Sequence, residues 1–405
     1  MASLFLVVAV LLCAAKLLGN LSVRLGLPSV IGEILAGVLL SSSALNLLGW
    51  PLPHGPGTLT AGQMEKILSG LAELGVLFLM FIAGLETDLE KMRKVGAAAF
   101  WSAMGGVLLP FLGGALLGRW TGYSWPVALF IGTLLTATSV SISAQTLMEL
   151  KALTSKEGSC ILGAAVIDDV LGVIVLSLVV ATALPSDGGS GALGSLLTTL
   201  GLMTAYFVVS IALGRRFFEP LLRWASGLRT TQAALAAALV VCLFYSWSAE
   251  VVGQVAAITG AYIAGTLFGR TSFREDLARR TEVFAYSFFV PLFLAHVGLQ
   301  TRLESLGGAM GFTAALLLIA VVGKIAGCGL GALALGFTPP ESLRVGVGMI
   351  SRGEVGLIIA SYGLSRGIID GTIFAEMVLM VLLTTLITPV GLKLVFPRAS
   401  LEKTI

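Results

Sequence analysis

Apolar segments of about 20 residues recur along the whole 405-residue chain, and short connections between them carry most of its basic residues. A run of this length is enough for a helix to cross the hydrocarbon core of a bilayer. Only 12% of the residues are charged and the mean hydropathy is +0.98, whereas about a quarter of a soluble domain is charged. The chain is therefore predicted to be an all-α polytopic membrane protein and not a soluble globule.

Thirteen membrane-spanning helices are expected, with no soluble domain appended. They lie near residues 2–23, 28–45, 66–86, 95–118, 124–149, 157–184, 194–214, 230–249, 255–269, 281–300, 309–335, 340–363 and 372–395. The N-terminus lacks the charged region and cleavage site of a signal peptide, so the first segment is expected to be a span.

The distribution of Lys and Arg predicts the orientation of these helices. With the N-terminus outside, 18 of the 25 basic residues fall in inside connections and four at outside ends. Cytoplasmic loops of membrane proteins carry such an excess of Lys and Arg. The C-terminus is then predicted to be cytoplasmic, in a multi-pass protein of a bacterial-type plasma membrane.

Two of the segments are interrupted by polar residues and glycine. The fifth contains TATSVSISA (136–144) and the twelfth contains GMISRGEVG (348–356). Non-helical backbone at membrane depth is tolerated where it is buried in protein or lines a cavity. The two segments cross in opposite directions, and paired interruptions of this kind indicate a transporter binding site between antiparallel halves.

The charged residues inside the predicted spans include Asp168, Asp169, Lys324, Arg352 and Glu354. Each charge at the bilayer centre costs about 2.5–3.5 kcal/mol, so the five would cost roughly 15 kcal/mol if they stayed unpaired. They are expected to face one another or water. A purely structural salt-bridge cluster is the alternative, and it would account for Arg352 with Glu354.

Asp169 and Lys324 lie near the midpoints of their helices, so they are predicted to sit at similar depth. Successive helical residues point about 100° apart, so Asp168 and Asp169 face different directions. The spacing of Gly323, Gly327 and Gly331 allows close helix packing. We therefore expect an ion pair between Lys324 and one aspartate, with the other aspartate available for a proton or a small cation.

Oxygen ligands suit a hard cation. The hydroxyls of Thr138 and Ser139, together with carbonyls freed where the fifth segment breaks, are predicted to complete the shell of a dehydrated Na⁺ beside Asp168 and Asp169. Competition between a cation and a proton at such a site, reached in turn from each side, would give exchange. A sodium-coupled solute symporter is the alternative from another class, and it would need a second polar cluster in a roomy cavity.

The motifs TATSVSISAQTLMEL, AAVIDDVLG, VVGKIAG and SRGEVGLIIA closely resemble the second monovalent cation/proton antiporter family, in particular its NapA/GerN-like sodium/proton antiporters. The resemblance covers essentially the whole chain. It implies Asp169 as the ion- and proton-binding carboxylate, Asp168 as the partner of Lys324, and Arg352 and Glu354 as supporting charges near the second break. It also implies electrogenic exchange, and it leaves a potassium/proton exchanger as the alternative.

The same resemblance implies an NhaA/NapA-like fold with two inverted repeats, an elevator-type motion and a homodimer. Residues 1–90 and 223–305 would form a dimerisation domain, residues 91–190 and 306–405 the moving core, and residues 191–222 a linker helix. Membrane lipid is an expected partner. No cofactor, enzymatic activity or nucleic-acid partner is expected.

The sequence departs from the family pattern at two positions. Ser351 stands where a proline is expected, and His296, in PLFLAHVGL, replaces a small or apolar residue. Histidine titrates near neutrality, so pH sensing is one interpretation of His296 and a buried, hydrogen-bonded histidine is the other. The sequence leaves open the choice among Na⁺, Li⁺ and K⁺, the stoichiometry, the pH profile, the physiological role and the aspartate that pairs with Lys324 in each state.

Overall fold

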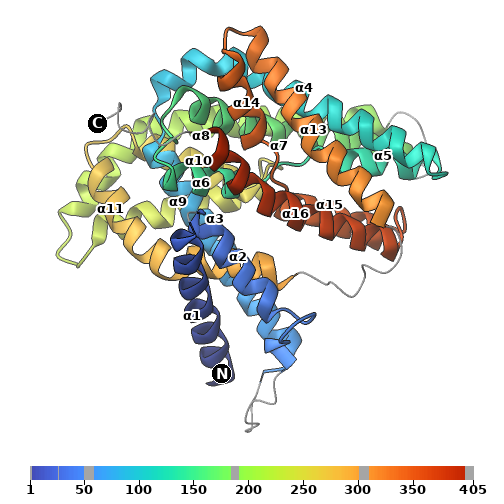
Figure 1. Cartoon of the computed structure of the whole chain (residues 1–405). Helices are drawn as coiled ribbons and strands as arrows, with labels where there is room; N and C mark the ends of the chain where they lie inside the picture. Colours follow the sequence, from blue (N-terminus) through green and yellow to red (C-terminus); the bar gives the residue numbers. More distant parts are fainter. Residues whose placement is uncertain (1, 26, 50–58, 184–190, 301–309, 397–405) are drawn as a thin grey trace.

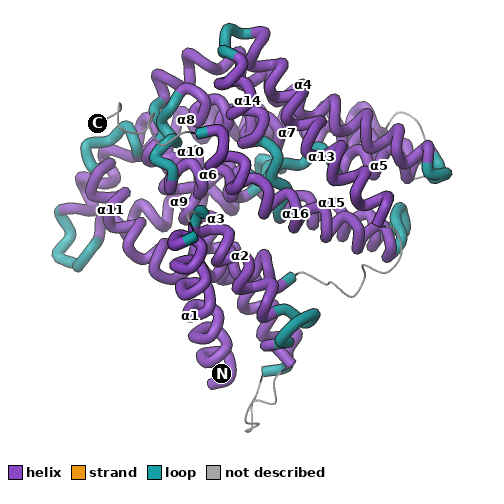
Figure 2. The backbone as a smooth tube through the Cα atoms, in the orientation of Figure 1, coloured by secondary structure: helices purple, strands orange, loops and turns teal. Residues whose placement is uncertain are grey.

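The computed structural model describes residues 2–25, 27–49, 59–183, 191–300 and 310–396, apart from some side chains within these ranges. Every regular element in this part of the chain is helical (Figure 2). The elements are α1 (Ala2–Arg24), α2 (Ser29–Leu40), η1 (Leu47–Gly49), α3 (Ala61–Glu86), α4 (Leu89–Trp120), α5 (Trp125–Leu134), α6 (Val140–Glu149), α7 (Lys156–Ala183), α8 (Gly191–Ser226), α9 (Ala233–Val251), α10 (Ala257–Phe268), α11 (Arg274–Phe284), the π-helical turn η2 (Ala285–Phe289), α12 (Val290–Leu299), α13 (Met310–Ala334), α14 (Pro339–Gly348), α15 (Glu354–Ser365) and α16 (Gly371–Val395).

The all-helical membrane class predicted from the sequence is confirmed. Within the described ranges, nine helices are long and apolar enough to cross a membrane, and four more are apolar but shorter. Large apolar side chains face outward, as they do toward lipid: Leu116, Trp120 and Leu394 are 63%, 86% and 78% exposed. Each predicted span overlaps a helix or a helix pair, while the count of thirteen crossings stays a prediction.

Several helix boundaries differ from those expected by five residues or more, and two of the differences lie in helices with basic residues. The segment predicted to end at residue 214 continues as α8 to Ser226, through Arg215, Arg216 and Arg223. The segment predicted to begin at residue 281 is preceded by α11, which starts at Arg274 and joins α12 through the π-helical turn. Basic residues end an apolar stretch of sequence, but the helix can continue through them. Their long side chains let the charged group reach the membrane–water interface from a helical backbone.

The fifth and twelfth segments are both broken in the middle. Residues 135–139 separate α5 from α6, and residues 349–353 separate α14 from α15. The breaks lie in the polar, glycine-containing stretches that the sequence singled out. Each break therefore leaves two half-helices that begin and end inside the protein.

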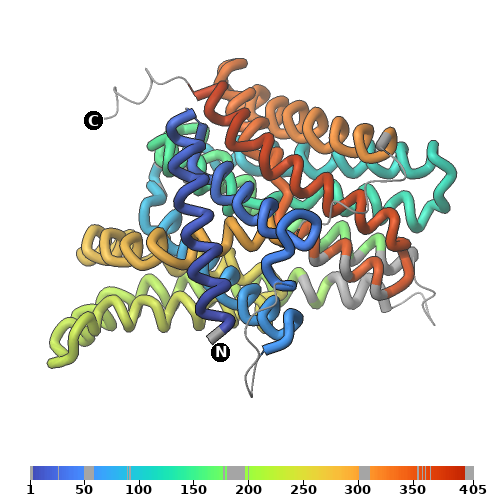
Figure 3. Tube along the Cα trace, turned by 60° about the horizontal axis from the view of Figure 1, so that its bottom comes forward, coloured from blue at the N-terminus to red at the C-terminus, as the bar shows by residue number. Residues whose placement is uncertain are grey.

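The helices pack in two groups. Helix α4 packs along α13 and also contacts α5 and α7, whereas α3 packs on α10 and α12, and α2 packs on α1 and α12. Figure 1 shows α4, α13 and α5 on one side of the molecule and α1, α2 and α3 on the other. In Figure 3, α13 and α16 (orange and red) lie side by side along one edge. The groups meet where α6 contacts α2 and α3, where α16 contacts α2 and where α7 contacts α8.

Candidate functional site

The two helix breaks touch each other at the centre of the protein. Ser139 donates its N–H to the Ser351 carbonyl (2.9 Å), and the Ser351 hydroxyl donates to the Ser139 carbonyl (2.6 Å). The Ser143 hydroxyl donates to the Gly348 carbonyl (2.5 Å), at the end of α14. Backbone groups freed in one break are thus satisfied by the other break, as buried polar groups require. A proline at position 351 would lack this hydroxyl.

Arg352 supports both breaks from within the protein. It is fully buried, and its guanidinium donates to the carbonyls of Ile350 (2.8 Å) and Met349 (3.3 Å), just past the end of α14. The same side chain donates to the Leu135 carbonyl (2.8 Å), at the end of α5. Helix C-termini carry partial negative charge and unpaired carbonyls. One buried cation therefore serves the C-terminal ends of two half-helices.

Asp168 on α7 forms a buried ion pair with Lys324 on α13. The Lys324 Nζ atom lies 2.6 Å from Asp168 Oδ2, and the two side chains are 0% and 2% exposed. The Thr138 hydroxyl, in the break after α5, donates to the same oxygen. The other carboxylate oxygen, Oδ1, is buried without a hydrogen-bond partner among the described atoms. Asp168 is thus tied to the first break and to α13 at once.

Lys324 reaches Asp168 across the surface of α4. The backbones of α4 and α13 touch, since a Cβ atom at Gly105 would overlap the Gly327 carbonyl. A Cβ atom at Gly106, the next residue, would lie 3.3 Å from Lys324 Nζ and would overlap the Cys328 sulfur. Helix α4 also packs on α7. Glycine at position 106 therefore leaves the space through which the lysine passes to the aspartate.

Asp169 lines a cavity of about 750 Å³ between the two helix groups. Its Oδ2 atom accepts a hydrogen bond from the Thr259 hydroxyl on α10 (2.7 Å). Asp168 and Thr138 also line this cavity, so both carboxylates reach the same space. A cation that enters the cavity meets two acidic side chains and one hydroxyl within one site.

The far part of the cavity carries additional titratable groups. Glu73 on α3, Glu250 near the end of α9 and His296 on α12 all line it. All three lie in the halves of their helices that are predicted to be outside. His296 is 6% exposed, and its Nε2 atom has no hydrogen-bond partner among the described atoms. The cavity thus leads from the aspartates toward one face of the protein.

A family model described as the sodium/hydrogen exchanger, transmembrane, matches residues 7–397. The chain belongs to this family. The chain is 39% identical to the Na⁺/H⁺-K⁺ antiporter GerN of Bacillus cereus, over 97% of this chain and 96% of that protein. It is 34% identical to a Na⁺/H⁺ antiporter of Enterococcus hirae, over 96% of each. The resemblance indicated by the sequence motifs is therefore confirmed.

The solved structures include the sodium proton antiporter MjNhaP1 from Methanocaldococcus jannaschii, which matches with a TM-score of 0.64. The match covers 96% of each chain at 15% sequence identity. A likeness at this identity shows a shared fold. It does not by itself carry site residues from one protein to the other.

Most residues singled out in the sequence come together in the structure. Asp168, Asp169 and Thr138 share one cavity with His296, and Lys324 contacts this group through Asp168. Ser139 is placed differently from the prediction. The Ser139 hydroxyl is buried against Gly353, where a Cβ atom would lie 2.5 Å from it, and it has no hydrogen-bond partner among the described atoms.

The side chain of Glu354 lies outside the described part of the chain, although its backbone begins α15. The polar partners described for the Arg352 guanidinium are carbonyl oxygens. The hypothesis of an Arg352–Glu354 salt bridge therefore stays a prediction, while the described contacts of Arg352 cap helix ends.

Two residues of the site were missed by the sequence interpretation. Thr259 lies in the apolar stretch AITGAYIAG, and only its position beside Asp169 gives it a role. Gly106 is one of 50 glycines, and its role follows from the path of Lys324. A threonine in an otherwise apolar helix was the one available signal, and it normally indicates a bond back to the same helix.

Proposed function

We propose that this exchanger is a secondary active transporter that exchanges Na⁺ or Li⁺ for H⁺ across the plasma membrane, at a site formed by Asp169 and Asp168. The observation that carries the proposal is the placement of two carboxylates on one cavity, one of them held by a buried lysine. Family membership and the antiporters named among the relatives support it. A fully buried charge pair is costly in a membrane, and charged residues inside membrane spans usually mark ion or proton pathways.

The ligands of the cation are proposed to be oxygen atoms near the first break. The Thr138 hydroxyl donates to Asp168 but keeps its lone pairs, and Asp168 Oδ1 is without a described partner. The carbonyls of Leu135 and Ser139 are already used by Arg352 and Ser351. Asp169, Asp168 and Thr138 are therefore the central ligands. Ser139 remains a proposed ligand only if its hydroxyl turns from Gly353 toward the cavity.

Exchange follows from competition at this site. A carboxylate that binds a cation is ionised, and a carboxylate that holds a proton is neutral, so Asp169 is occupied by one or the other. A cation beside Asp168 also competes with the ammonium of Lys324 for the same carboxylate. We propose that Lys324 then releases a proton, so that more than one proton is exchanged per Na⁺ and transport is electrogenic. Arg352 stays charged and maintains both breaks.

An elevator-type motion is proposed to expose the site to each side in turn. The moving core would comprise α4–α7 and α13–α16, and the dimerisation domain would comprise α1–α3 and α9–α12, with α8 as the linker. The packing of α4 on α13 and of α3 on α10 supports this division. The dimerisation domain is proposed to mediate a homodimer. The linker predicted at residues 191–222 would then extend to Ser226, where α8 ends.

One polar contact between the two groups lies at their predicted cytoplasmic side. Glu149, at the end of α6, accepts hydrogen bonds from the N–H (2.9 Å) and hydroxyl (2.5 Å) of Ser29, at the start of α2. These residues lie at the predicted cytoplasmic ends of their helices, whereas the cavity opens toward the predicted outside. We propose that the structure is an outward-facing state and that the Glu149–Ser29 contact closes its cytoplasmic side.

The experiment that tests the proposed function is cation-driven proton flux in proteoliposomes. Na⁺, Li⁺ and K⁺ gradients are applied one at a time, with membrane voltage either clamped or free. Sodium-driven flux that is lost in Asp169→Asn, and that slows without the voltage clamp, would support electrogenic Na⁺/H⁺ exchange. Flux driven by K⁺ alone would favour the potassium/proton exchanger. K⁺ is included in the test because the GerN relative is named a Na⁺/H⁺-K⁺ antiporter. No cation-dependent proton flux would contradict exchange and favour symport.

A further inference from the structure

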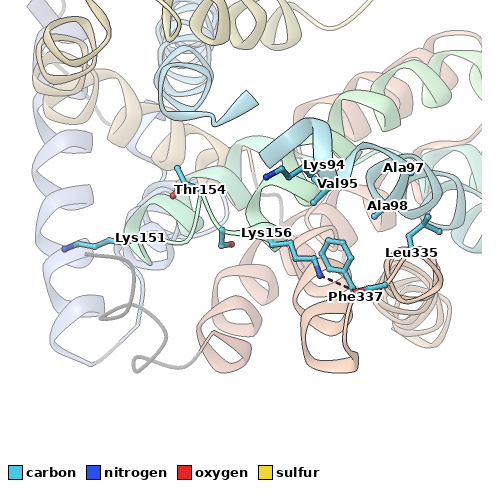
Figure 4. A pocket seen from close by; sticks show the side chains of 11 residues that line it. Lys94, Val95, Ala97, Ala98, Lys151, Thr154, Lys156, Leu335 and Phe337 are labelled. Carbon is cyan, nitrogen blue, oxygen red and sulfur yellow. Dashed lines mark hydrogen bonds between the residues drawn. The ribbon is translucent and has the colours of Figure 1, made fainter. Parts of the chain in front are cut away.

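A second cavity, of about 490 Å³, lies outside the cation site, at the predicted cytoplasmic end of the core helices. Its lining comes from the start of α4, the connection from α6 to α7 and the connection from α13 to α14. These three segments are far apart in the sequence. Figure 4 shows Lys94 on α4 extending toward Thr154 and Lys156 extending beneath the ring of Phe337.

Among the described residues, three lysines and no acidic residue line this cavity. Lys156 is engaged, since its Nζ atom lies 3.0 Å from Glu341 and 3.9 Å from the centre of the Phe337 ring. Lys94 and Lys151 are exposed and form no ion pair with any residue in the described ranges. Two positive charges of the lining are therefore without a described counter-charge.

The start of α7 adds further hydrogen-bond donors and positive potential. Thr154 and Ser155 line the cavity, and the Ser155 hydroxyl accepts from the Gly158 N–H (3.0 Å) as it caps this 28-residue helix. The N-terminus of a long helix favours an anion, because its first N–H groups are unpaired and its dipole is positive there. Together with the two lysines, this end of α7 makes the cavity suited to a phosphate group.

The other wall of the cavity is apolar and continues onto the lipid-facing surface. Val95, Ala97, Ala98 and Leu335 line it. Beyond them, Trp101 on α4 and Leu330 and Leu333 on α13 are 54%, 59% and 43% exposed. Helices α4 and α13 pack together at this level, since a Cβ atom at Gly331 would overlap the Trp101 carbonyl. An acyl chain that follows this surface would end at the lysines.

We infer that this cavity binds the phosphate of an anionic phospholipid from the cytoplasmic leaflet, with the headgroup between Lys94, Lys151 and the start of α7. A lipid is favoured over a soluble phosphate because the apolar surface of α4 and α13 is continuous with the cavity. Basic pockets between helices on the cytoplasmic side are suited to such headgroups. The inference does not depend on the transported ion.

The test is native mass spectrometry of the purified full chain, with phosphatidylglycerol or phosphatidylcholine added at matched concentrations. The variant Lys94→Gln/Lys151→Gln removes both unpaired charges and leaves Lys156 with Glu341. Because each lysine near a charged surface contributes roughly a fivefold effect, the double variant should bind phosphatidylglycerol about 30-fold more weakly. Phosphatidylcholine binding should be weak in both proteins. The charge-conserving Lys94→Arg/Lys151→Arg should retain binding.

The matched control is Arg215→Gln/Arg216→Gln, which removes two charges from the predicted cytoplasmic end of α8, away from the cavity. Its phosphatidylglycerol binding should equal that of the unmodified chain. Equal loss in both double variants would overturn the inference, because it would indicate a general attraction to positive charge. If inorganic phosphate at millimolar concentration competes with phosphatidylglycerol, the inference that the bound phosphate group belongs to a lipid would be overturned. Unchanged lipid binding in the Lys94→Gln/Lys151→Gln variant would overturn the site itself.

Discussion

The ion pair between Asp168 and Lys324 gives the sharpest prediction about stability. The Lys324 side chain is 0% exposed, and Asp168 is its ion-pair partner among the described residues. The substitution Asp168→Asn keeps the size of the side chain but leaves the ammonium without a counter-charge. Breaking a buried pair from one side costs about 3–5 kcal/mol, so the free energy of unfolding should fall by roughly that amount.

The double variant Asp168→Asn/Lys324→Met removes the uncompensated charge together with its partner. Replacing both members of a buried pair by uncharged residues is often close to neutral, so most of the loss should be recovered, with a coupling energy of about 3 kcal/mol. Asp169→Asn is the matched control. Asp169 lies on the cavity and not in the pair, and the asparagine oxygen can still accept from Thr259, so the cost should be about 1 kcal/mol or less.

The assay is SDS titration in mixed micelles, followed by the fluorescence of the six tryptophans. The account predicts a large loss in Asp168→Asn, recovery in the double variant and little change in Asp169→Asn. Equal losses in the two asparagine variants would refute the assignment of Asp168 as the partner of Lys324. Additive losses in the double variant would show that the two side chains are not coupled.

Three further predictions follow from contacts around the site. Gly106→Val should abolish exchange and lower thermal stability, because its Cβ atom would meet Lys324 and Cys328. Gly96→Val is the control, since a Cβ atom there meets nothing within 4 Å. A thermal shift assay compares the two variants. Thr259→Val removes a hydrogen bond to the Asp169 carboxylate, and such a bond is worth about 1.5–3 kcal/mol. The apparent KM for Na⁺ in flux assays should therefore change by tenfold or more. Thr266→Val is the control, because it loses only a hydrogen bond to its own helix and should leave the KM unchanged. Glu149→Ala should open the predicted cytoplasmic side. A cysteine introduced by Val30→Cys, at a position that is 0% exposed, should then react faster with a thiol reagent, and an unchanged rate would contradict the role of Glu149 as a closing contact.

The sequence predicts those features that depend on local composition. Runs of apolar residues locate the helices, and the polar stretches around Thr138 and Arg352 locate both breaks, because hydropathy and helix interruption are properties of one segment. The cost of charges in a membrane also predicts that Lys324 meets an aspartate. The family resemblance implies that this aspartate is Asp168, and in this structure Lys324 pairs with Asp168.

Features that depend on which helices are neighbours could not be predicted in this way. The glycine stripe that ends at Gly331 was expected to bring α13 to the aspartates, but it packs on α4, and Lys324 crosses to α7 at Gly106. Arg352 donates to carbonyls of two helices that are far apart in the sequence, and no sequence pattern predicted these contacts. Thr259 contacts Asp169 only because α10 lies opposite α7 across the cavity.

Competition between Na⁺ and H⁺ at Asp169 is the central claim, and the most direct test is the apparent KM for Na⁺ as a function of pH. The measurement uses proteoliposomes on a solid support, where each Na⁺ concentration jump gives a transport current. The account predicts that acidification raises the KM for Na⁺, by up to tenfold per pH unit for each proton that Na⁺ displaces, while the maximal current at saturating Na⁺ stays constant, and that Asp169→Asn gives no current. A KM that does not change with pH, or a sodium-driven current that persists in Asp169→Asn, would contradict it.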